Sequence, residues 1–175
     1  MEIRVLLPSD DRSSFRSGNI ELDRFFQRFA GQNQFRLQLG VTHVAVEAGE
    51  VLGFATVSAA QVRLSELPAA ERKGLPAYPV PVIRLSRLAV SQPAQGRGIG
   101  GALLRHVNRL AVELSREKLG CAGVLVDAKP EARAFYARYG FIELEAEEGA
   151  LAAHLEATQL FLGVRRIRAA LSSQH

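Results

Sequence analysis

One stretch of the sequence decides the fold: Ile83-Arg84-Leu85-Ser86-Arg87-Leu88-Ala89-Val90, then Ser91 to Ala94, then Gln95-Gly96-Arg97-Gly98-Ile99-Gly100-Gly101. The first part predicts a strand, the second predicts a short loop, and the glycine cluster opens onto the apolar helical run Ala102-Leu103-Leu104. Glycines let a backbone approach a phosphate closely, and the free N–H groups and dipole of a helix N-terminus favour its negative charge. The sequence therefore predicts an anion cradle at the start of a helix.

The glycine cluster also contains the pattern G-x-G-x-x-G of dinucleotide-binding proteins. That fold needs the first glycine directly after a strand, an acidic residue about 20 positions on, and further β-α repeats. Here a loop containing Pro93 intervenes, Glu117 falls inside a helical pattern, and a single β-α unit follows. A phosphate-binding P-loop is excluded because no Gly-Lys-Ser/Thr follows the glycines. A tight loop that only joins helix and strand is disfavoured, because clustered glycines cost backbone entropy.

Composition indicates one globular domain. The chain has 175 residues, of which 47% are hydrophobic and 23% charged. We expect a domain over residues 1–165 and a basic C-terminal tail over 166–175. No apolar run approaches the roughly 18 residues of a membrane span, and the N-terminus lacks the regions of a signal peptide, so we expect a soluble cytoplasmic protein without a membrane partner. The single cysteine, Cys121, excludes internal disulfides and multi-cysteine metal sites, and its apolar neighbours predict a buried thiol.

The charge pattern favours a polyanionic ligand. The formal net charge is +4, and most of the basic residues are arginines, whose planar forks suit phosphate. Glutamates gather in residues 141–157, whereas basic residues gather on the helix after the glycines. This polarity leaves a positive side on the molecule.

The remaining pattern predicts the order of the elements. We expect strands at 2–7, 42–47, 51–58, 83–90, 122–127, 141–144 and 157–164, and helices from Asn19, over 97–118 and over 131–138. Residues 60–82 contain four prolines and predict a long ordered excursion. The first helix has a predicted apolar stripe of Leu22, Phe25, Phe26, Phe29 and Ala30, with Arg24 and Arg28 on its other face.

Two spaced motifs resemble the GNAT superfamily of acetyl-coenzyme A-dependent N-acetyltransferases. They are Gln95-x-x-Gly98-x-Gly100 directly after Leu88-Ala89-Val90, and Ala132-x-x-Phe135-Tyr136-x-x-x-Gly140-Phe141 some thirty residues later. Three further segments resemble the GNAT toxins of type II toxin–antitoxin modules: Phe15-Arg16-Ser17-Gly18-Asn19, Tyr78-Pro79-Val80-Pro81-Val82 and Leu125-Val126-Asp127-Ala128-Lys129. The resemblance implies an α/β fold with a mixed, centrally splayed sheet and helices on both faces.

The resemblance also implies roles for residues of the donor site. The backbone of Leu88, Ala89 and Val90 would pair with the pantetheine arm of acetyl-CoA, and the Val90 N–H would polarise the thioester carbonyl. The pyrophosphate would lie on the N–H groups of Gln95, Gly96, Arg97, Gly98, Ile99 and Gly100, with Arg97 adding charge. Tyr136 would protonate the departing sulfur. Phe135 is expected in the core beside the cofactor, and Lys129 stands where the wider superfamily commonly has asparagine, although lysine fits the toxin subgroup.

The acceptor side is less defined by the sequence. None of His43, His106, His154 and His175 is an obvious general base, which suits an α-amine because its reference pKa of about 7.7–8.0 leaves it partly neutral. Arginines that could hold the phosphates of a tRNA acceptor end are Arg24, Arg28, Arg36, Arg84 and Arg87.

We therefore expect acetylation of aminoacyl-tRNA, which would halt translation. The resemblance implies a ribbon-helix-helix antitoxin as partner and a homodimer, and it implies no metal. An acetyltransferase for a small amine or a protein N-terminus is the enzymatic alternative. The non-enzymatic alternative is a module that senses acetyl-CoA or serves as an antitoxin and DNA-complex partner.

Overall fold

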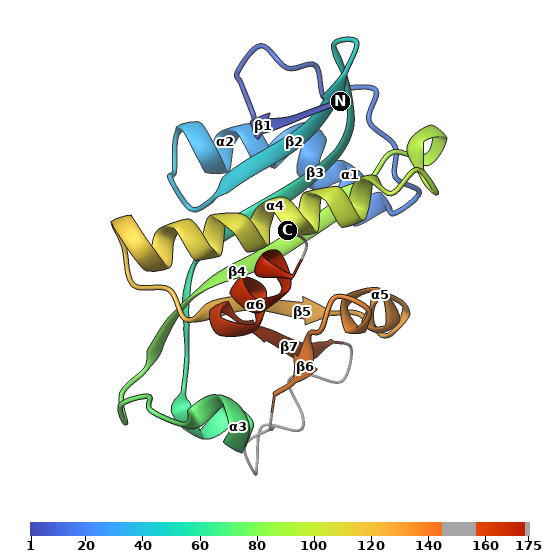
Figure 1. Ribbon diagram of the computed structural model, residues 1–175. Coiled ribbons are helices and arrows are strands. Elements are labelled where there is room, and N and C mark those ends of the chain that lie inside the picture. The colour runs from blue at the N-terminus through green and yellow to red at the C-terminus, as the bar shows by residue number, and fades with distance from the viewer. Residues whose placement is uncertain (145–156, 174–175) are drawn as a thin grey trace. The chain divides into compact units, whose positions relative to one another are not determined.

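The computed structural model describes residues 1–144 and 157–173 (Figure 1). Within them, seven strands form one mixed sheet in the order β1-β2-β3-β4-β5-β7-β6, which confirms the predicted α/β fold. The strands are β1 Glu2–Val5, β2 Val41–Glu47, β3 Glu50–Val62, β4 Val80–Val90, β5 Gly123–Ala128, β6 Ile142–Glu143 and β7 Thr158–Gly163. The α-helices are α1 Ile20–Arg24, α2 Ala30–Phe35, α3 Ala69–Arg72, α4 Ile99–Glu113, α5 Arg133–Ala137 and α6 Val164–Ser172. Single turns of other helix types are η1 Phe25–Phe29, η2 Leu64–Glu66, η3 Gln92–Ala94, η4 Leu114–Lys118 and η5 Pro130–Ala132.

The chain forms two compact units. The first joins Met1–Ser58 to Leu85–Val107, and the second joins Ala59–Arg84 to the described part of Asn108–His175. Strands β3 and β4 and helix α4 each contribute residues to both units. None of the helices in the described ranges is long and apolar enough to cross a membrane.

The strands predicted at 42–47 and 51–58 form a hairpin in the first unit. Strands β2 and β3 are antiparallel, and Glu47 pairs with Glu50 across the two-residue turn Ala48-Gly49. Both turn residues have positive φ, 52° and 83°, as the hairpin turns that match strand twist require. Strand β3 extends to Val62, beyond the predicted end at Ser58.

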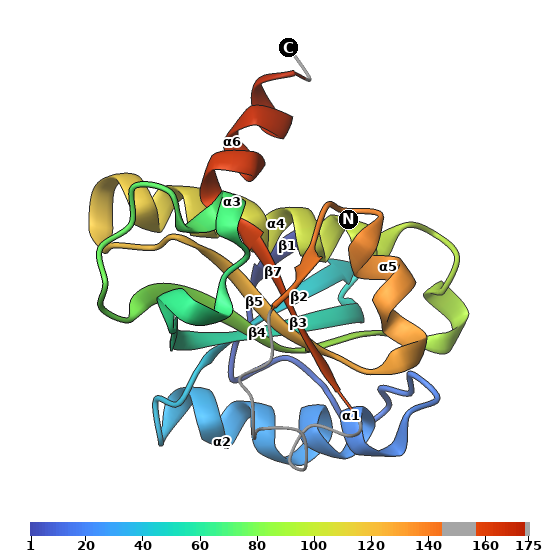
Figure 2. The same ribbon diagram turned by 90° about the horizontal axis from the view of Figure 1, so that it is seen from below.

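Helices cover both faces of the first unit's strands. In Figure 2, α1 and α2 lie on one side of β1–β3, and the start of α4 lies on the other. Successive strand residues point to opposite faces, and β3 illustrates this with two neighbours. The Phe54 ring stacks on that of Phe26 with centroids 4.4 Å apart, whereas a Cβ on Gly53 would lie 3.1 Å from Leu103 of α4. The first unit's core is therefore aromatic on the α1 side and tightly packed on the α4 side.

The first helix begins as predicted and then changes its winding. The Asn19 side chain caps it by accepting hydrogen bonds from the N–H groups of Glu21 and Leu22. From Phe25 the chain makes one π-helical turn, and the N–H of Ala30 donates to the Phe25 carbonyl five residues back. Phe25 and Ala30 are buried, but Phe29 is 39% exposed. The prediction that Phe29 belongs to the buried stripe was wrong, because a π turn shifts the register by one residue.

The second unit contains antiparallel pairs of β5 with β7 and β7 with β6. The excursion expected over residues 60–82 is shorter than predicted, because β3 runs to Val62 and β4 begins at Val80; η2 and α3 lie between them. The predicted helix over 97–118 is α4, which begins at Ile99 and is followed by the π turn η4. Cys121 is buried as predicted, its thiol donates to the Gly123 carbonyl, and burial raises its pKa.

The basic residues near the C-terminus, which were expected in a tail after the domain, lie in a helix. Residues 166–172 belong to α6. Arg165 donates to the Lys73 carbonyl at 3.2 Å, and Arg166 forms an ion pair with the buried Glu71 at 2.6 Å. Two of the three arginines of α6 are thus fixed to the end of α3.

Candidate functional site

The glycine loop of the first unit has the backbone geometry of an anion cradle. It follows β4 and η3, and Gly96 and Gly98 have φ values of +79° and +78°, which favour glycine. The hydrogen bond from the Ala102 N–H to the Gly98 carbonyl, 3.0 Å long, opens the helical ladder of α4. The N–H groups of Ile99 and Gly100 precede that bond, so α4 itself does not satisfy them. Together with the helix dipole they form a site that fits a phosphate group.

The hydrogen bonds of Gln95 stabilise this loop, and its backbone N–H is not available to a phosphate. Its side-chain amide donates to the Ser17 carbonyl at 2.8 Å and to the Val90 carbonyl at 3.1 Å. Its backbone N–H donates to the Gln92 carbonyl within η3. The Gln95 N–H is therefore removed from the predicted cradle, whose donors begin at Gly96.

Arg97 is exposed beside the cradle and holds an acidic partner. Its guanidinium lies 2.6 Å from a carboxylate oxygen of Glu47 at the end of β2. This hydrogen bond and the charge of Arg97 lower the pKa of Glu47. An incoming phosphate would compete with Glu47 for Arg97, because both ligands are anions.

The end of β4 is held by a close approach of β3. A Cβ placed on Gly53 would lie 2.9 Å from the Ala89 carbonyl, nearer than side chains tolerate. The Ser91 N–H donates to the Leu52 carbonyl at 2.8 Å just after the strand ends. The close approach at Gly53 was not predicted from the sequence, although an isolated glycine inside a strand pattern is a signal of close backbone contact.

Tyr136 lies in α5 of the second unit and is buried, with 6% of its surface exposed. Its ring makes edge-to-face contacts with Phe141 and Phe135, at centroid distances of 5.5 and 5.1 Å. Burial raises the pKa of Tyr136 to about 12, so its phenol stays protonated at neutral pH. This is the protonation state that a proton donor needs.

Phe135 is only half-buried, so its predicted place in the core was wrong. Neighbouring residues on a helix point about 100° apart. Because Tyr136 points into the core, Phe135 points toward the edge of the buried face, where its ring contacts that of Tyr139. Lys129 is exposed at the start of η5.

The five arginines proposed for tRNA are divided between the units. Arg24, Arg28, Arg36 and Arg87 are exposed residues of the first unit. The guanidinium carbon of Arg87 lies 3.9 Å from the centroid of the Phe25 ring. Arg84 belongs to the second unit and forms an ion pair with Asp127 at 2.6 Å. This ion pair would have to open before Arg84 could contact a phosphate, as would the pair of Arg97 with Glu47.

Two histidines meet inside the first unit. His43 of β2 is buried, and its Nδ1 lies 2.9 Å from Nε2 of His106 in α4. Burial, and secondarily the charge of His106, lowers the pKa of His43 to about 4. His43 is therefore neutral at physiological pH and serves packing between β2 and α4. The other two histidines, His154 and His175, lie outside the described residues.

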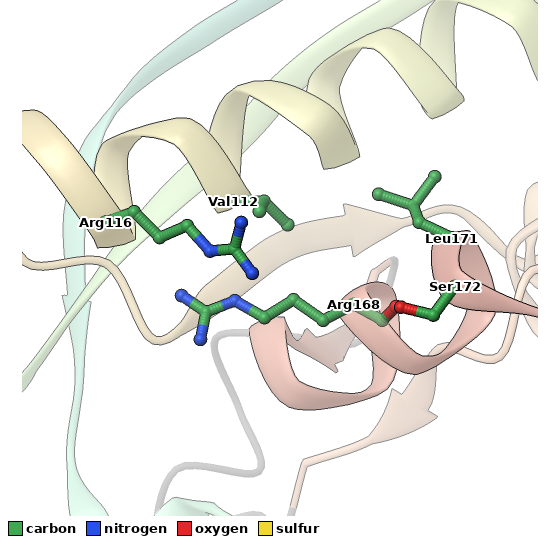
Figure 3. A pocket seen from close by; sticks show the side chains of 5 residues that line it. All are labelled: Val112, Arg116, Arg168, Leu171 and Ser172. Atoms are coloured by element: carbon green, nitrogen blue, oxygen red, sulfur yellow. The ribbon is translucent and has the colours of Figure 1, made fainter.

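The second unit carries an open pocket of about 390 Å³ lined by Val112, Arg116, Arg168, Leu171 and Ser172. Figure 3 shows the guanidinium groups of Arg116 and Arg168 pointing toward one another from η4 and from α6. Arg168 donates to the hydroxyl of Ser115 at 2.7 Å. The pocket contains none of the residues that the sequence motifs identified.

Comparisons with known proteins show the family of the chain. The acetyltransferase (GNAT) domain family matches residues 38–143, which include β2, β3, β4, the cradle, α4, β5 and Tyr136. A protein of Mycobacterium tuberculosis named tRNA-acetylating toxin is 38% identical over 140 residues, covering 79% of this chain and 82% of that protein.

Solved structures also resemble the chain over nearly its whole length. A bacterial toxin is similar with a TM-score of 0.85 and 26% identity, covering 99% of this chain and 97% of that one. The structure of AtaT complexed with acetyl-methionyl-tRNAfMet is similar with a TM-score of 0.84 and 24% identity, covering 97% and 98%. Because the family matches more than half of this chain, the chain belongs to the GNAT acetyltransferases.

Proposed function

We propose that this acetyltransferase transfers the acetyl group of acetyl-CoA to the α-amino group of aminoacyl-tRNA and acts as a toxin that blocks translation. The observation that carries the proposal is the mycobacterial relative, which is named for this activity and is 38% identical over four-fifths of the chain. The first unit supports it by combining a phosphate cradle with exposed arginines. A blocked α-amine cannot form a peptide bond, so translation would stop.

The cradle would hold the pyrophosphate of the acetyl donor. The N–H groups of Gly96 through Gly100 would donate to its oxygens, and Arg97 would add charge after leaving Glu47. The backbone of Leu88, Ala89 and Val90 at the end of β4 would pair with the pantetheine amides as an added strand does. The Val90 N–H would stabilise the charge that develops on the thioester carbonyl oxygen.

Tyr136 would supply the proton that the reaction requires. The amine nitrogen forms a bond to the acetyl carbon, the carbon–sulfur bond breaks, and the departing thiolate takes a proton from the Tyr136 hydroxyl. The proton lost by the amine returns, through solvent, to the tyrosinate. Because burial keeps the pKa of Tyr136 at about 12, the hydroxyl is restored at every pH where tRNA is stable.

The substrate amine would need little assistance from the protein. An α-amine is partly neutral at pH 7.7–8.0, whereas a lysine side chain with a reference pKa of about 10.4 needs a base. Arg24, Arg28, Arg36 and Arg87 would hold phosphates of the acceptor end. Lys129 and Phe135 would contribute further contacts to the acetyl donor.

The partners belong to the same proposal. We propose a ribbon-helix-helix antitoxin as the neutralising partner, a homodimer as the assembly, and the cytoplasm, where charged tRNA is used, as the place of action. Support for the antitoxin comes from AtaT, a toxin of the same fold that is known in complex with the C-terminus of its antitoxin AtaR.

The ionic-strength dependence of the rate tests the substrate class. Acetylation of an aminoacyl-tRNA is compared with acetylation of the methyl ester of the same amino acid, which has the same α-amine without phosphates. Four arginine–phosphate contacts predict that kcat/KM for the tRNA falls about 50–150-fold between 50 and 200 mM salt. The methyl ester should change less than about twofold. Equal salt dependence for both substrates would contradict a tRNA acceptor and favour a small amine.

A further inference from the structure

Phe29 is held at the surface by the winding of its own helix. The apolar spacing of the sequence predicts that it faces the core, yet 39% of its surface is exposed. The π turn Phe25–Phe29 produces this result, because it places Ala30 instead of Phe29 beneath Phe25. π turns are rare and occur often at functional positions. A large aromatic side chain kept out of the core by such a turn calls for a ligand.

The neighbours of Phe29 are cationic. The Arg24 guanidinium carbon lies 5.8 Å from the Phe29 ring centroid, and Arg28 precedes Phe29 on the same turn as another exposed residue. An exposed aromatic ring next to arginines is the arrangement with which proteins bind unpaired nucleotides, because bases stack on the ring while cations meet the phosphates. A purely apolar partner would leave both cations without counterions.

We propose that Phe29 is a stacking platform for an unpaired base at the acceptor end of the tRNA, with Arg24 and Arg28 contacting the flanking phosphates. This inference rests on the proposed function and deepens it, since it names the part of the substrate that the first helix recognises. Phe25 is not available for this role, because it is buried and the Arg87 guanidinium lies over its ring.

The experiment measures binding of the full-length protein to a fluorescein-labelled single-stranded RNA octamer ending in CCA, by fluorescence anisotropy. Phe29→Leu keeps an apolar side chain of similar reach but removes the aromatic face, and Phe29→Tyr restores that face. Phe35→Leu is the matched control: Phe35 ends the same helical segment, is 42% exposed, and within the described residues has no arginine over its ring.

Stacking of one base predicts that Phe29→Leu weakens binding by about 5-fold to 150-fold, while Phe29→Tyr and Phe35→Leu stay within about twofold of the unmodified protein. An octamer with abasic sugars in place of its last three bases should bind the unmodified protein and Phe29→Leu equally. Equal affinity of Phe29→Leu for the intact octamer would overturn the proposal. So would a shift of Phe29→Leu to a smaller species in sedimentation with unchanged RNA affinity, which would assign the ring to a contact between copies of the chain.

The binding assay contains neither acetyl-CoA nor a charged amino acid. Its failure is therefore distinguishable from failure of the proposed reaction. If charged tRNA is acetylated and Phe29→Leu binds RNA normally, the substrate is right and the platform is wrong. If RNA binding depends on Phe29 but no acetyl group is transferred, the platform is right and the reaction is wrong.

Discussion

The central carbon of the Arg87 guanidinium lies over the Phe25 ring, 3.9 Å from its centroid. Phe25 is part of the aromatic core of the first unit, and Arg87 directly precedes the strand residues Leu88 to Val90. Burial lowers the pKa of Arg87. The core thus fixes the position of one cation beside the strand proposed to bind the acetyl donor.

Replacing Arg87 by lysine tests whether its contact with Phe25, and not only its positive charge, matters for tRNA binding. Lysine keeps the positive charge but loses the contact of the guanidinium with the Phe25 ring, and cation–π contacts contribute about 0.5–2 kcal/mol. We expect KM for aminoacyl-tRNA to rise about 2–30-fold with KM for acetyl-CoA unchanged. Steady-state kinetics with each substrate varied in turn gives both values, and Arg109→Lys, an exposed change on α4, serves as the control. Equal rises in both KM values would place Arg87 in the donor site instead.

Tyr136→Phe tests the proton donor. The change removes only the hydroxyl and keeps the ring that packs against Phe135 and Phe141. General acid catalysis contributes about 10²–10⁴-fold, so kcat should fall by that range while the thermal midpoint stays within a few degrees. Unchanged kcat would reduce Tyr136 to a packing residue.

The pH profile should rise toward alkaline pH and then level off. Because the pKa of Tyr136 is raised to about 12, the phenol is protonated throughout the accessible range and produces no alkaline loss. The acceptor amine must be neutral, so kcat/KM should increase about tenfold per pH unit below its pKa and become constant above about pH 8. A bell-shaped profile with a descending limb below pH 9 would contradict Tyr136 as the acid. The same raised pKa contributes stability at pH values below 10 that is lost as the pH rises from about 10 toward 12.

Gly98→Ala tests whether the cradle binds acetyl-CoA, with Gly74→Ala as the control for lost stability. Gly98 and Gly74 have nearly equal φ values, +78° and +80°, and a Cβ on either would meet no atom within 4 Å. Both substitutions should destabilise the fold by about 1–2 kcal/mol because alanine disfavours this conformation. Only Gly98→Ala should also raise KM for acetyl-CoA, since Gly74 lies in the excursion after α3. A similar KM change in Gly74→Ala would show that lost stability, not the cradle, is responsible.

Local patterns predicted the parts of the fold that local chemistry determines. The Asn19 cap follows from residue type, and the hairpin between β2 and β3 was expected from the segment Ala48-Gly49-Glu50, of which Ala48 and Gly49 form the turn. The family motifs lie where the sequence placed them, after β4 and in α5.

The features that the sequence does not predict are contacts between residues distant along the chain. Arg84 forms an ion pair with Asp127 of β5. Arg97 meets Glu47, fifty positions earlier, and the sequence gives no sign of that pair. The π turn that exposes Phe29 is likewise a product of packing against Phe54 and its neighbours rather than of helix propensity.

Transfer of labelled acetyl groups from acetyl-CoA to tRNA tests the central claim most directly. The purified protein is incubated with radiolabelled acetyl-CoA and with the same tRNA pool in charged and uncharged form, and mild alkaline hydrolysis then releases the amino acid for mass spectrometry. We predict label on charged tRNA alone, release of the label as an N-acetyl amino acid, and loss of the signal with Tyr136→Phe. Charged tRNA that stays unlabelled, or uncharged tRNA that is labelled equally, would contradict the account.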